Sequence, residues 1–214
     1  MIRVTKSPNA PQSLSTTQAY DGPDVLQQLE KDHHKKCYLC ERRLYTEFQV
    51  EHHKSQDNHP GLRQDWNNLF WTCGYCNGKK QNRYDNMLHP ATRNIEEEIK
   101  HFMDFSSKQA TFTPLIETDE HQETCNFLNK IHNGRNKKLR TKREENFIEY
   151  VIGVVNNFYR LVCNYLSNPN AENHVLVQEE LRVDKECLGF KYWIVKDNPH
   201  LIAAFGNDIV WNKQ

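Results

Sequence analysis

The chain has 214 residues, of which 37% are hydrophobic, and its 28 lysines and arginines balance its 28 aspartates and glutamates. A formal net charge of zero excludes a protein whose whole surface attracts a polyanion, so any contact with nucleic acid must be local or come from a partner. The sequence has no long apolar run and begins Met-Ile-Arg without an apolar signal stretch. We therefore expect a cytoplasmic protein with reduced thiols and no membrane segment.

The chain opens with a Pro- and Ser-rich arm that is followed by a predicted helix. The arm extends from Ser7 to Asp24, and the helix from Val25 to His33. Together they form the first predicted region, residues 1–36. The next region, residues 37–90, contains the motifs that carry chemistry.

Two Cys-x-x-Cys pairs enclose the most informative stretch, and their members are Cys37, Cys40, Cys73 and Cys76. Two residues between paired cysteines let each pair bind a zinc ion from a turn, and two pairs complete a closed tetrahedral site. The stretch between the pairs, Glu41 to Thr72, is longer than in a simple zinc ribbon. We predict that the two pairs bind one structural Zn²⁺ and hold together the ends of an inserted element.

The inserted element is predicted to be a strand, a loop and a second strand, with a helix after it. Phe48 to His52 alternates apolar and polar residues, which is typical of a short half-buried strand. Asn68 to Thr72 is rich in strand-forming residues, and the polar run from Asn77 to Tyr84 has helical character.

The order of these motifs resembles the HNH, or ββα-metal, endonuclease family in its zinc-stapled form. The shared motifs are Cys-x-x-Cys, Glu-His-His, Asn-Leu and Cys-x-x-Cys-Asn-x-x-Lys, over about residues 37–83. The resemblance implies a small α+β nuclease core that hydrolyses phosphodiester bonds. That reaction needs a base that deprotonates water and a cation that absorbs charge on the phosphate and the leaving oxygen.

By this resemblance, His52 is the general base, and Glu51 and Asn77 bind a catalytic Mg²⁺ or Mn²⁺. Hard ions of this kind prefer oxygen ligands. Asn68 matches the asparagine that fixes the loop carrying the base. Many members of the family have histidine at the position of Asn77, and the asparagine form favours an oxygen-loving ion over zinc.

Each assignment has an alternative. His53 is the alternative base, because neighbouring strand residues point to opposite faces and only one of the two histidines shares a face with Val50. Asn77 could instead cap the following helix. The cations on that helix could bind phosphate or simply be solvated, and they are Lys79, Lys80 and Arg83.

The rest of the chain is predicted to be a connection, residues 91–123, and a mainly helical C-terminal region, residues 124–214. Ile95 to Phe105 and Thr111 to Leu115 suit a hairpin, although the three glutamates at 96–98 make a helix equally compatible. Apolar residues then recur at three- and four-residue steps along one long amphipathic helix, namely Phe147, Val151, Val154, Phe158, Val162 and Tyr165. Shorter predicted helices follow at Ala171 to Leu181 and at Leu188 to Ile194, the latter ending near Asn198-Pro199.

One concentrated basic stretch, from Lys130 to Arg143, has no acidic residue before Glu144. Such a stretch is either a solvated helix face or a contact with nucleic acid or an acidic partner. The sequence leaves these alternatives open.

The flanking segments resemble the PtuB-type HNH subunits of Septu antiphage systems, whose layout the retron-associated HNH proteins share. The segments are Ile2–Ser7, Tyr20–Pro23, His89-Pro90 and Phe127–Asn129. The resemblance implies a DNA-cleaving effector of antiviral defence that acts with an ABC-type ATPase subunit similar to PtuA. The alternatives are an effector that cleaves RNA such as tRNA, as the retron relatives suggest, and a non-catalytic zinc-stapled binding module.

Overall fold

The computed structural model describes residues 1–17, 19–134 and 137–211. Its first part contains α1 (Ser13–Thr16), α2 (Pro23–Asp32), β1 (Gln49–His52), β2 (Leu69–Thr72) and α3 (Gly74–Lys80). Its second part contains α4 (Ile95–Glu98), β3 (Ile99–Asp104), β4 (Gln109–Pro114), α5 (Asp119–Asn133), α6 (Lys142–Ser167), α7 (Ala171–Glu180), α8 (Leu188–Lys196) and α9 (Pro199–Phe205). Short 3-10 turns are η1 (Pro60–Leu62), η2 (Trp66–Asn68) and η3 (Lys137–Leu139).

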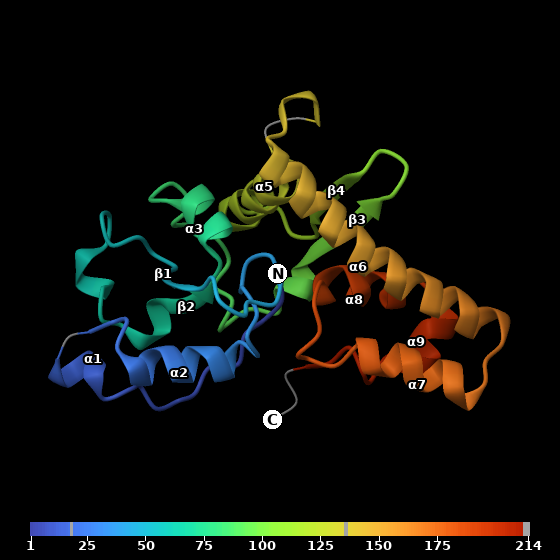
Figure 1. Cartoon of the computed structure of the whole chain (residues 1–214), viewed down its shortest axis with the longest axis horizontal. Coiled ribbons are helices and arrows are strands. Elements are labelled where there is room, and N and C mark those ends of the chain that lie inside the picture. The colour runs from blue at the N-terminus through green and yellow to red at the C-terminus, as the bar shows by residue number, and fades with distance from the viewer. Residues whose placement is uncertain (18, 135–136, 212–214) are drawn as a thin grey trace.

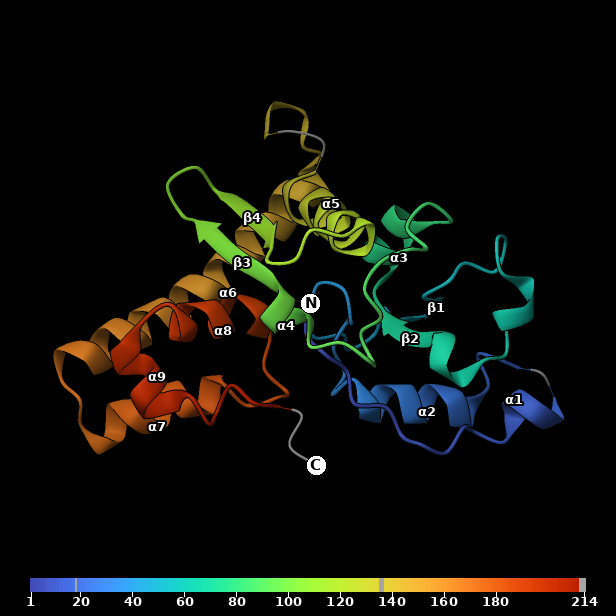
Figure 2. The same ribbon diagram turned by 180° about the vertical axis from the view of Figure 1, so that it is seen from behind.

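Figures 1 and 2 show β1 and β2 on one side of the molecule with α1, α2 and α3, and α6 to α9 on the other side. The hairpin of β3 and β4 and the helix α5 lie between these two parts. This mixture of small antiparallel sheets and a helical C-terminal region confirms the predicted α+β class.

The motif region folds as a strand pair followed by a helix. β1 and β2 are antiparallel, with Glu51 opposite Phe70 and His52 opposite Leu69. All four residues of β2 are buried, which explains its nearly continuous apolar sequence. The predicted strands are confirmed, whereas the helix runs from Gly74 to Lys80 and so begins and ends earlier than the polar run from Asn77 to Tyr84 predicts.

The helix α2 supports β2 from below the sheet in the view of Figure 1. Pro23 occupies the first turn, where its missing N–H costs no helical hydrogen bond. Val25 and Leu29, one turn apart, are the residues that α2 buries. The helix predicted from Val25 to His33 is therefore confirmed, with both ends shifted toward the N-terminus.

The connection contains both of the structures that the sequence leaves open. The glutamates at 96–98 lie in the single turn of α4, and the hairpin of β3 and β4 follows at once. Asp104 closes the hairpin turn, because its carboxylate accepts hydrogen bonds from the amide of Ser106 at 2.9 Å and the hydroxyl of Ser107 at 2.6 Å.

The long helix α6 begins with a capping box, in which the side chain of Thr141 and that of Glu144 each accept from the other residue's backbone amide. Its predicted apolar face is confirmed at four positions, namely Phe147, Val151, Phe158 and Val162. Val154 and Tyr165 are only half-buried, and Val155 is buried in place of Val154. The helix end predicted near Asn198-Pro199 is confirmed, because α8 ends at Lys196, but the sequence missed the helix that follows. Asn198 caps a further helix, α9, whose first residue is proline.

The buried apolar side chains form two groups, and the boundary between the groups lies within α6. The first joins β2, α2, the hairpin and α5 with the N-terminal half of α6, which includes Phe147 and Val151. The second lies among α7, α8 and α9 and begins at Phe158. Within the described ranges, no helix combines the length and the apolar character that a membrane crossing requires.

Candidate metal centre and active site

Four sulfur atoms meet in the motif region. The Sγ atoms of Cys37, Cys40, Cys73 and Cys76 all lie within 4.8 Å of one another, and all four residues are buried. Tetrahedral zinc with Zn–S bonds of about 2.3 Å needs sulfur atoms about 3.8 Å apart, and Cys40 Sγ and Cys73 Sγ are 3.9 Å apart. The donor set and its spacing fit a structural zinc ion.

The chain presents each cysteine pair from a turn. Cys37 and Cys40 lie in the loop between α2 and β1, and Cys73 is the N-cap of α3. The Sγ of Cys73 accepts a hydrogen bond from the amide of Cys76 at 3.4 Å. Hydrogen bonds from the three other thiols hold the pKa of Cys73 far below its usual range, so this sulfur is prepared to act as a thiolate ligand.

A polar cavity of about 460 Å³ lies at the end of β1, and Asn77 in its lining directly follows Cys76 in the chain. Its lining residues come from β1, the loop after it, α3 and the turn that follows α3, and they are Val50, Glu51, His52, Ser55, Gln56, Asp57, Asn77, Gln81 and Asn82. The structure thus brings together three of the residues that the family resemblance singles out.

The imidazole of His52 is held in one orientation. Its Nε2 lies 3.0 Å from the carbonyl oxygen of Arg63, which can only accept, so Nε2 carries the hydrogen and Nδ1 keeps its lone pair. Tyr20, from the N-terminal arm, contacts the ring edge-on with centroids 4.8 Å apart. Burial lowers the pKa of His52 below its ordinary value, which keeps the ring neutral at pH 7. A neutral, oriented imidazole can accept a proton from water.

Asn68 is buried behind the cavity and fastens the loop that orients His52. Its Oδ1 accepts from the amide of Lys54 at 2.7 Å, and its Nδ2 donates to the carbonyls of Lys54 at 2.9 Å and Leu62 at 3.2 Å. Leu62 directly precedes Arg63, whose carbonyl holds the imidazole. These contacts give Asn68 the geometry of a loop-fixing residue.

Glu51 is paired with a lysine inside the protein. The Nζ of Lys80 lies 2.9 Å from Glu51 Oε1 and 3.8 Å from Asp85 Oδ1, and it donates to the carbonyl of His52 at 3.0 Å. The exposed fraction is 0% for Lys80 and 6% for Glu51. Burial raises the pKa of Glu51 to about 7, and the charge of Lys80 opposes this rise. Lys80 therefore has an internal role here, rather than a position at the surface where phosphate could reach it.

Replacing Lys80 by methionine is expected to destabilise the protein by about 3–5 kcal/mol, because Glu51 then stays buried without its cation. Chemical denaturation of the zinc-loaded protein measures this loss. Lys142→Met is the matched control, since the exposed pair of Lys142 with Glu145, at 3.6 Å, contributes at most about 1 kcal/mol. Equal free energies of unfolding for the two variants would contradict the internal role of Lys80.

Asn77 presents its side chain to the same cavity from α3. It does not cap the helix, because α3 begins at Gly74 and Cys73 occupies the N-cap. The Nδ2 of Asn77 donates to Gln49 Oε1 at 2.8 Å, which leaves its amide oxygen available as a ligand. A carboxylate from Glu51 and an amide oxygen are hard donors, so the set fits Mg²⁺ or Mn²⁺.

His53 lies in the interior, away from the cavity. Its exposed fraction is 1%, and its Nε2 lies 3.2 Å from the carbonyl oxygen of Met87. The ring packs edge-on against His89, with centroids 4.8 Å apart. Burial lowers the pKa of His53 to about 3. The geometry therefore favours His52 over His53 as the base.

The other cations of the motif helix are not in the cavity. Lys79 pairs with Glu144 at 2.5 Å, and Arg83 is exposed beyond the end of α3. A contact between either side chain and phosphate stays a prediction.

The basic stretch from Lys130 to Arg143 is divided in the structure between α5, η3 and α6. Lys130 and Arg140 use their charged groups to donate to backbone carbonyls, at 2.9 and 2.8 Å respectively. Arg135 and the side chain of Lys137 lie outside the described residues. The cations of the stretch that are exposed are Lys138, Lys142 and Arg143.

Sequence reasoning missed the residues that orient the site from outside the motifs. Tyr20 is distant in sequence, and Arg63 acts through its backbone, which leaves no signal in the residue type. Asp85 accepts from the amide and hydroxyl of Ser55 at 2.8 and 2.7 Å and so anchors the loop after β1. The lysine of Cys-Asn-x-x-Lys is the signal that could have led to Asp85 and to the pairing of Lys80, because a buried lysine needs carboxylates.

Two comparisons with known proteins agree with this geometry. The model of the HNH endonuclease family matches residues 37–83. Over 116 residues the chain is 30% identical to the Septu protein PtuB of Bacillus thuringiensis, and the match covers 45% of this chain and 45% of that protein. The chain thus spans less than half the length of this curated relative. The resemblance that the motifs indicate is confirmed for residues 37–83, which match the HNH endonuclease family.

Proposed function

We propose that this chain is a divalent-metal-dependent endonuclease that hydrolyses phosphodiester bonds. The observation that carries the proposal is the single cavity that contains Glu51, His52 and Asn77. A base and two oxygen donors are the groups that this hydrolysis requires. A binding module without activity has no need of an oriented, neutral imidazole in such a cavity.

The side chains have separate tasks in this proposal. His52 takes a proton from the attacking water at Nδ1, while the carbonyl of Arg63 keeps the ring in position. Glu51 and Asn77 would hold Mg²⁺ or Mn²⁺, which when bound supplies positive charge to the scissile phosphate and the leaving oxygen. Asn68 keeps the loop from Lys54 to Leu62 in place.

We propose DNA as the substrate and a Septu-type antiphage complex as the setting. Support comes from the similarity to the Septu protein PtuB and from the flanking segments. The formal net charge of zero fits a nuclease whose affinity for nucleic acid comes in part from an ABC-type ATPase subunit. Cleavage of RNA such as tRNA is the alternative that an assay must separate.

The test is cleavage of plasmid DNA and of tRNA by the purified chain, with and without the ATPase subunit. We expect Mg²⁺- or Mn²⁺-dependent cutting of DNA that increases when the ATPase is present. Cutting of tRNA alone would support the RNA alternative. Absence of cutting in every combination, with zinc bound and the fold intact, would support the binding module.

Asn77→Ala is expected to raise the Mg²⁺ or Mn²⁺ concentration for half-maximal cleavage on the order of 10–100-fold, because an oxygen donor is removed from the ion. A titration of cleavage rate against metal concentration measures the effect. Asn82→Ala is the matched control, since Asn82 lines the same cavity and its Nδ2 donates to Asp57 at 3.2 Å. A similar shift for both variants would show that Asn77 is not a specific ligand.

A further inference from the structure

We propose that a second groove binds a single-stranded segment of nucleic acid beside the bond that is cut. The proposal rests on the nuclease function proposed above. The groove has a volume of about 720 Å³, and its arginine and tyrosine residues are Arg42, Arg43, Arg143, Tyr45, Tyr75 and Tyr150. We call it the arginine–tyrosine groove.

The charge of the groove suits phosphate. Its lining contains three arginines and one carboxylate, that of Glu47. Arg43 is neutralised by Asp184 at 3.1 Å. No ion pair among the described residues engages Arg42 or Arg143, and Arg143 lies over the ring of Tyr75, 5.3 Å from its centroid. Arg42 is half-buried beside the clustered cysteines, whereas Arg143 is exposed and available for bidentate contacts with phosphate oxygens.

The aromatic side chains of the groove favour unpaired bases. Tyr45 has an exposed fraction of 78%, so its ring is open to a ligand. Phe48, three residues later, does not line the groove, but it stacks on Trp71 with centroids 4.0 Å apart and keeps an exposed fraction of 38%. Exposed rings bind nucleic acid by stacking on bases, and bases are free to do so only where the strand is unpaired.

The groove is next to the catalytic cavity. Glu47 lines the groove and Val50 lines the cavity, so the chain between them spans at most about 11 Å. The helix α3 also joins the two, because Tyr75 lines the groove and Asn77 lines the cavity. The two are thus lined by neighbouring stretches of the same elements, and the proposal places in the groove the part of the strand that adjoins the cavity.

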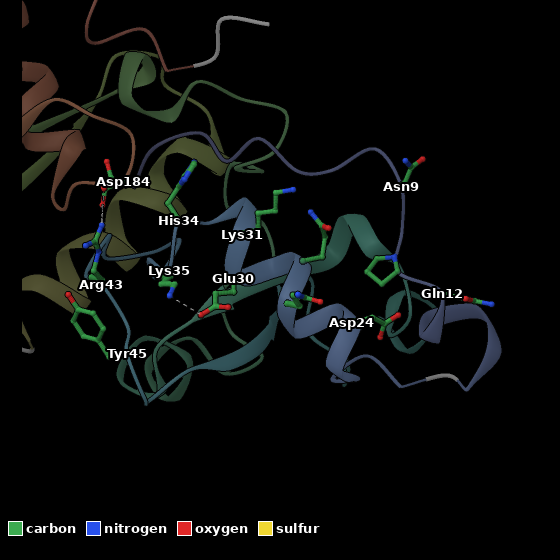
Figure 3. Close-up of a pocket in the computed structure, with 13 residues that line it drawn as sticks. Asn9, Gln12, Asp24, Glu30, Lys31, His34, Lys35, Arg43, Tyr45 and Asp184 are labelled. Atoms are coloured by element: carbon green, nitrogen blue, oxygen red, sulfur yellow. Dashed lines mark hydrogen bonds and ion pairs between the residues drawn. The ribbon is translucent and has the colours of Figure 1, made fainter. Parts of the chain in front are cut away.

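The larger cavity on the other side of Tyr45 does not share this character. Figure 3 shows Arg43 and Tyr45 at one end of it, with α2 along its length. Its volume is about 1110 Å³, and its lysines and arginine are matched by acidic residues, as in the pairs Arg43–Asp184 and Lys35–Glu30. A charge-balanced cavity does not attract a polyanion, so the inference is confined to the arginine–tyrosine groove.

The test measures binding by the full-length, zinc-loaded chain carrying His52→Ala, which leaves the probe uncut. The probes are a labelled single-stranded DNA oligonucleotide and its duplex, titrated at several salt concentrations by fluorescence anisotropy. Tyr45→Ala is expected to weaken single-strand binding by about 5- to 150-fold through lost stacking. Arg143→Glu is expected to weaken it by about tenfold or more and to reduce the salt slope by at least about 0.7.

Two matched controls lie outside the groove. Lys142→Glu makes a charge reversal one residue away on α6, and Tyr159→Ala removes another exposed tyrosine, with an exposed fraction of 46%. Both should bind as the parent does. The proposal is overturned if Tyr45→Ala and Arg143→Glu bind the single strand like these controls, or if their duplex binding falls as much as their single-strand binding. It is also overturned if the two variants keep their nucleic-acid binding and lose only their binding to the ATPase subunit. Cleavage by the chain with His52 restored is scored separately, so failure of the groove and failure of the nuclease proposal give different results.

Discussion

His52→Ala is expected to lower the cleavage rate by about 10²–10⁴-fold at saturating Mg²⁺ or Mn²⁺, which is the usual contribution of a positioned base. The variant should keep its fold and its zinc, because the side chain lies at the edge of the cavity and not among the cysteines. Single-turnover cleavage measures the rate, and circular dichroism and zinc content verify the structure.

The matched control is His59→Ala, because the exposed His59 lies near the same loop, 3.7 Å from Asp85. This variant should cut at nearly the normal rate. His53→Ala removes a buried ring, so it should lower the free energy of unfolding more than the rate. If His53→Ala did not cleave and His52→Ala cleaved at a nearly normal rate, the base would have been assigned to the wrong histidine.

The parts of the structure that the sequence predicted are those fixed by short-range spacing. Ligands of a zinc site must lie at set intervals on two turns, so Cys37 and Cys40 and the second pair could be identified without knowledge of the fold. The buried face of α6 follows from helical periodicity. The sequence indicated Val154 where Val155 is buried, because positions three and four residues after Val151 lie on the same helix face.

The parts that could not be predicted depend on contacts between distant segments. Lys80 resembles any other lysine on a polar helix until Glu51 and Asp85 are seen around its ammonium group. Tyr20 reaches His52 only because the N-terminal arm folds back along the motif region. The carbonyl of Arg63 orients the base whatever the residue type at that position, so no sequence pattern could indicate it.

Loss of the zinc ion is expected to unfold the motif region. Structural zinc binding by four cysteines has an apparent free energy of about 10–16 kcal/mol, and a whole domain is stable by only about 5–15 kcal/mol. We expect one zinc ion per chain in the purified protein, measured by elemental analysis, and insoluble or unfolded protein for Cys73→Ser. Because the cysteines belong to the same core as Phe70 and Leu128, the disruption should extend to α5.

The control is Cys163→Ser, which changes an exposed cysteine on α6, outside the cluster. It should keep the zinc content and the free energy of unfolding of the parent, which separates loss of the cluster from loss of a thiol in general. Removal of zinc by a chelator should reproduce the effect of Cys73→Ser on circular dichroism, and cleavage should disappear with the fold since β1 and α3 carry the cavity. Zinc-free protein that keeps its native spectrum and its activity would show that the four cysteines are not a structural metal centre.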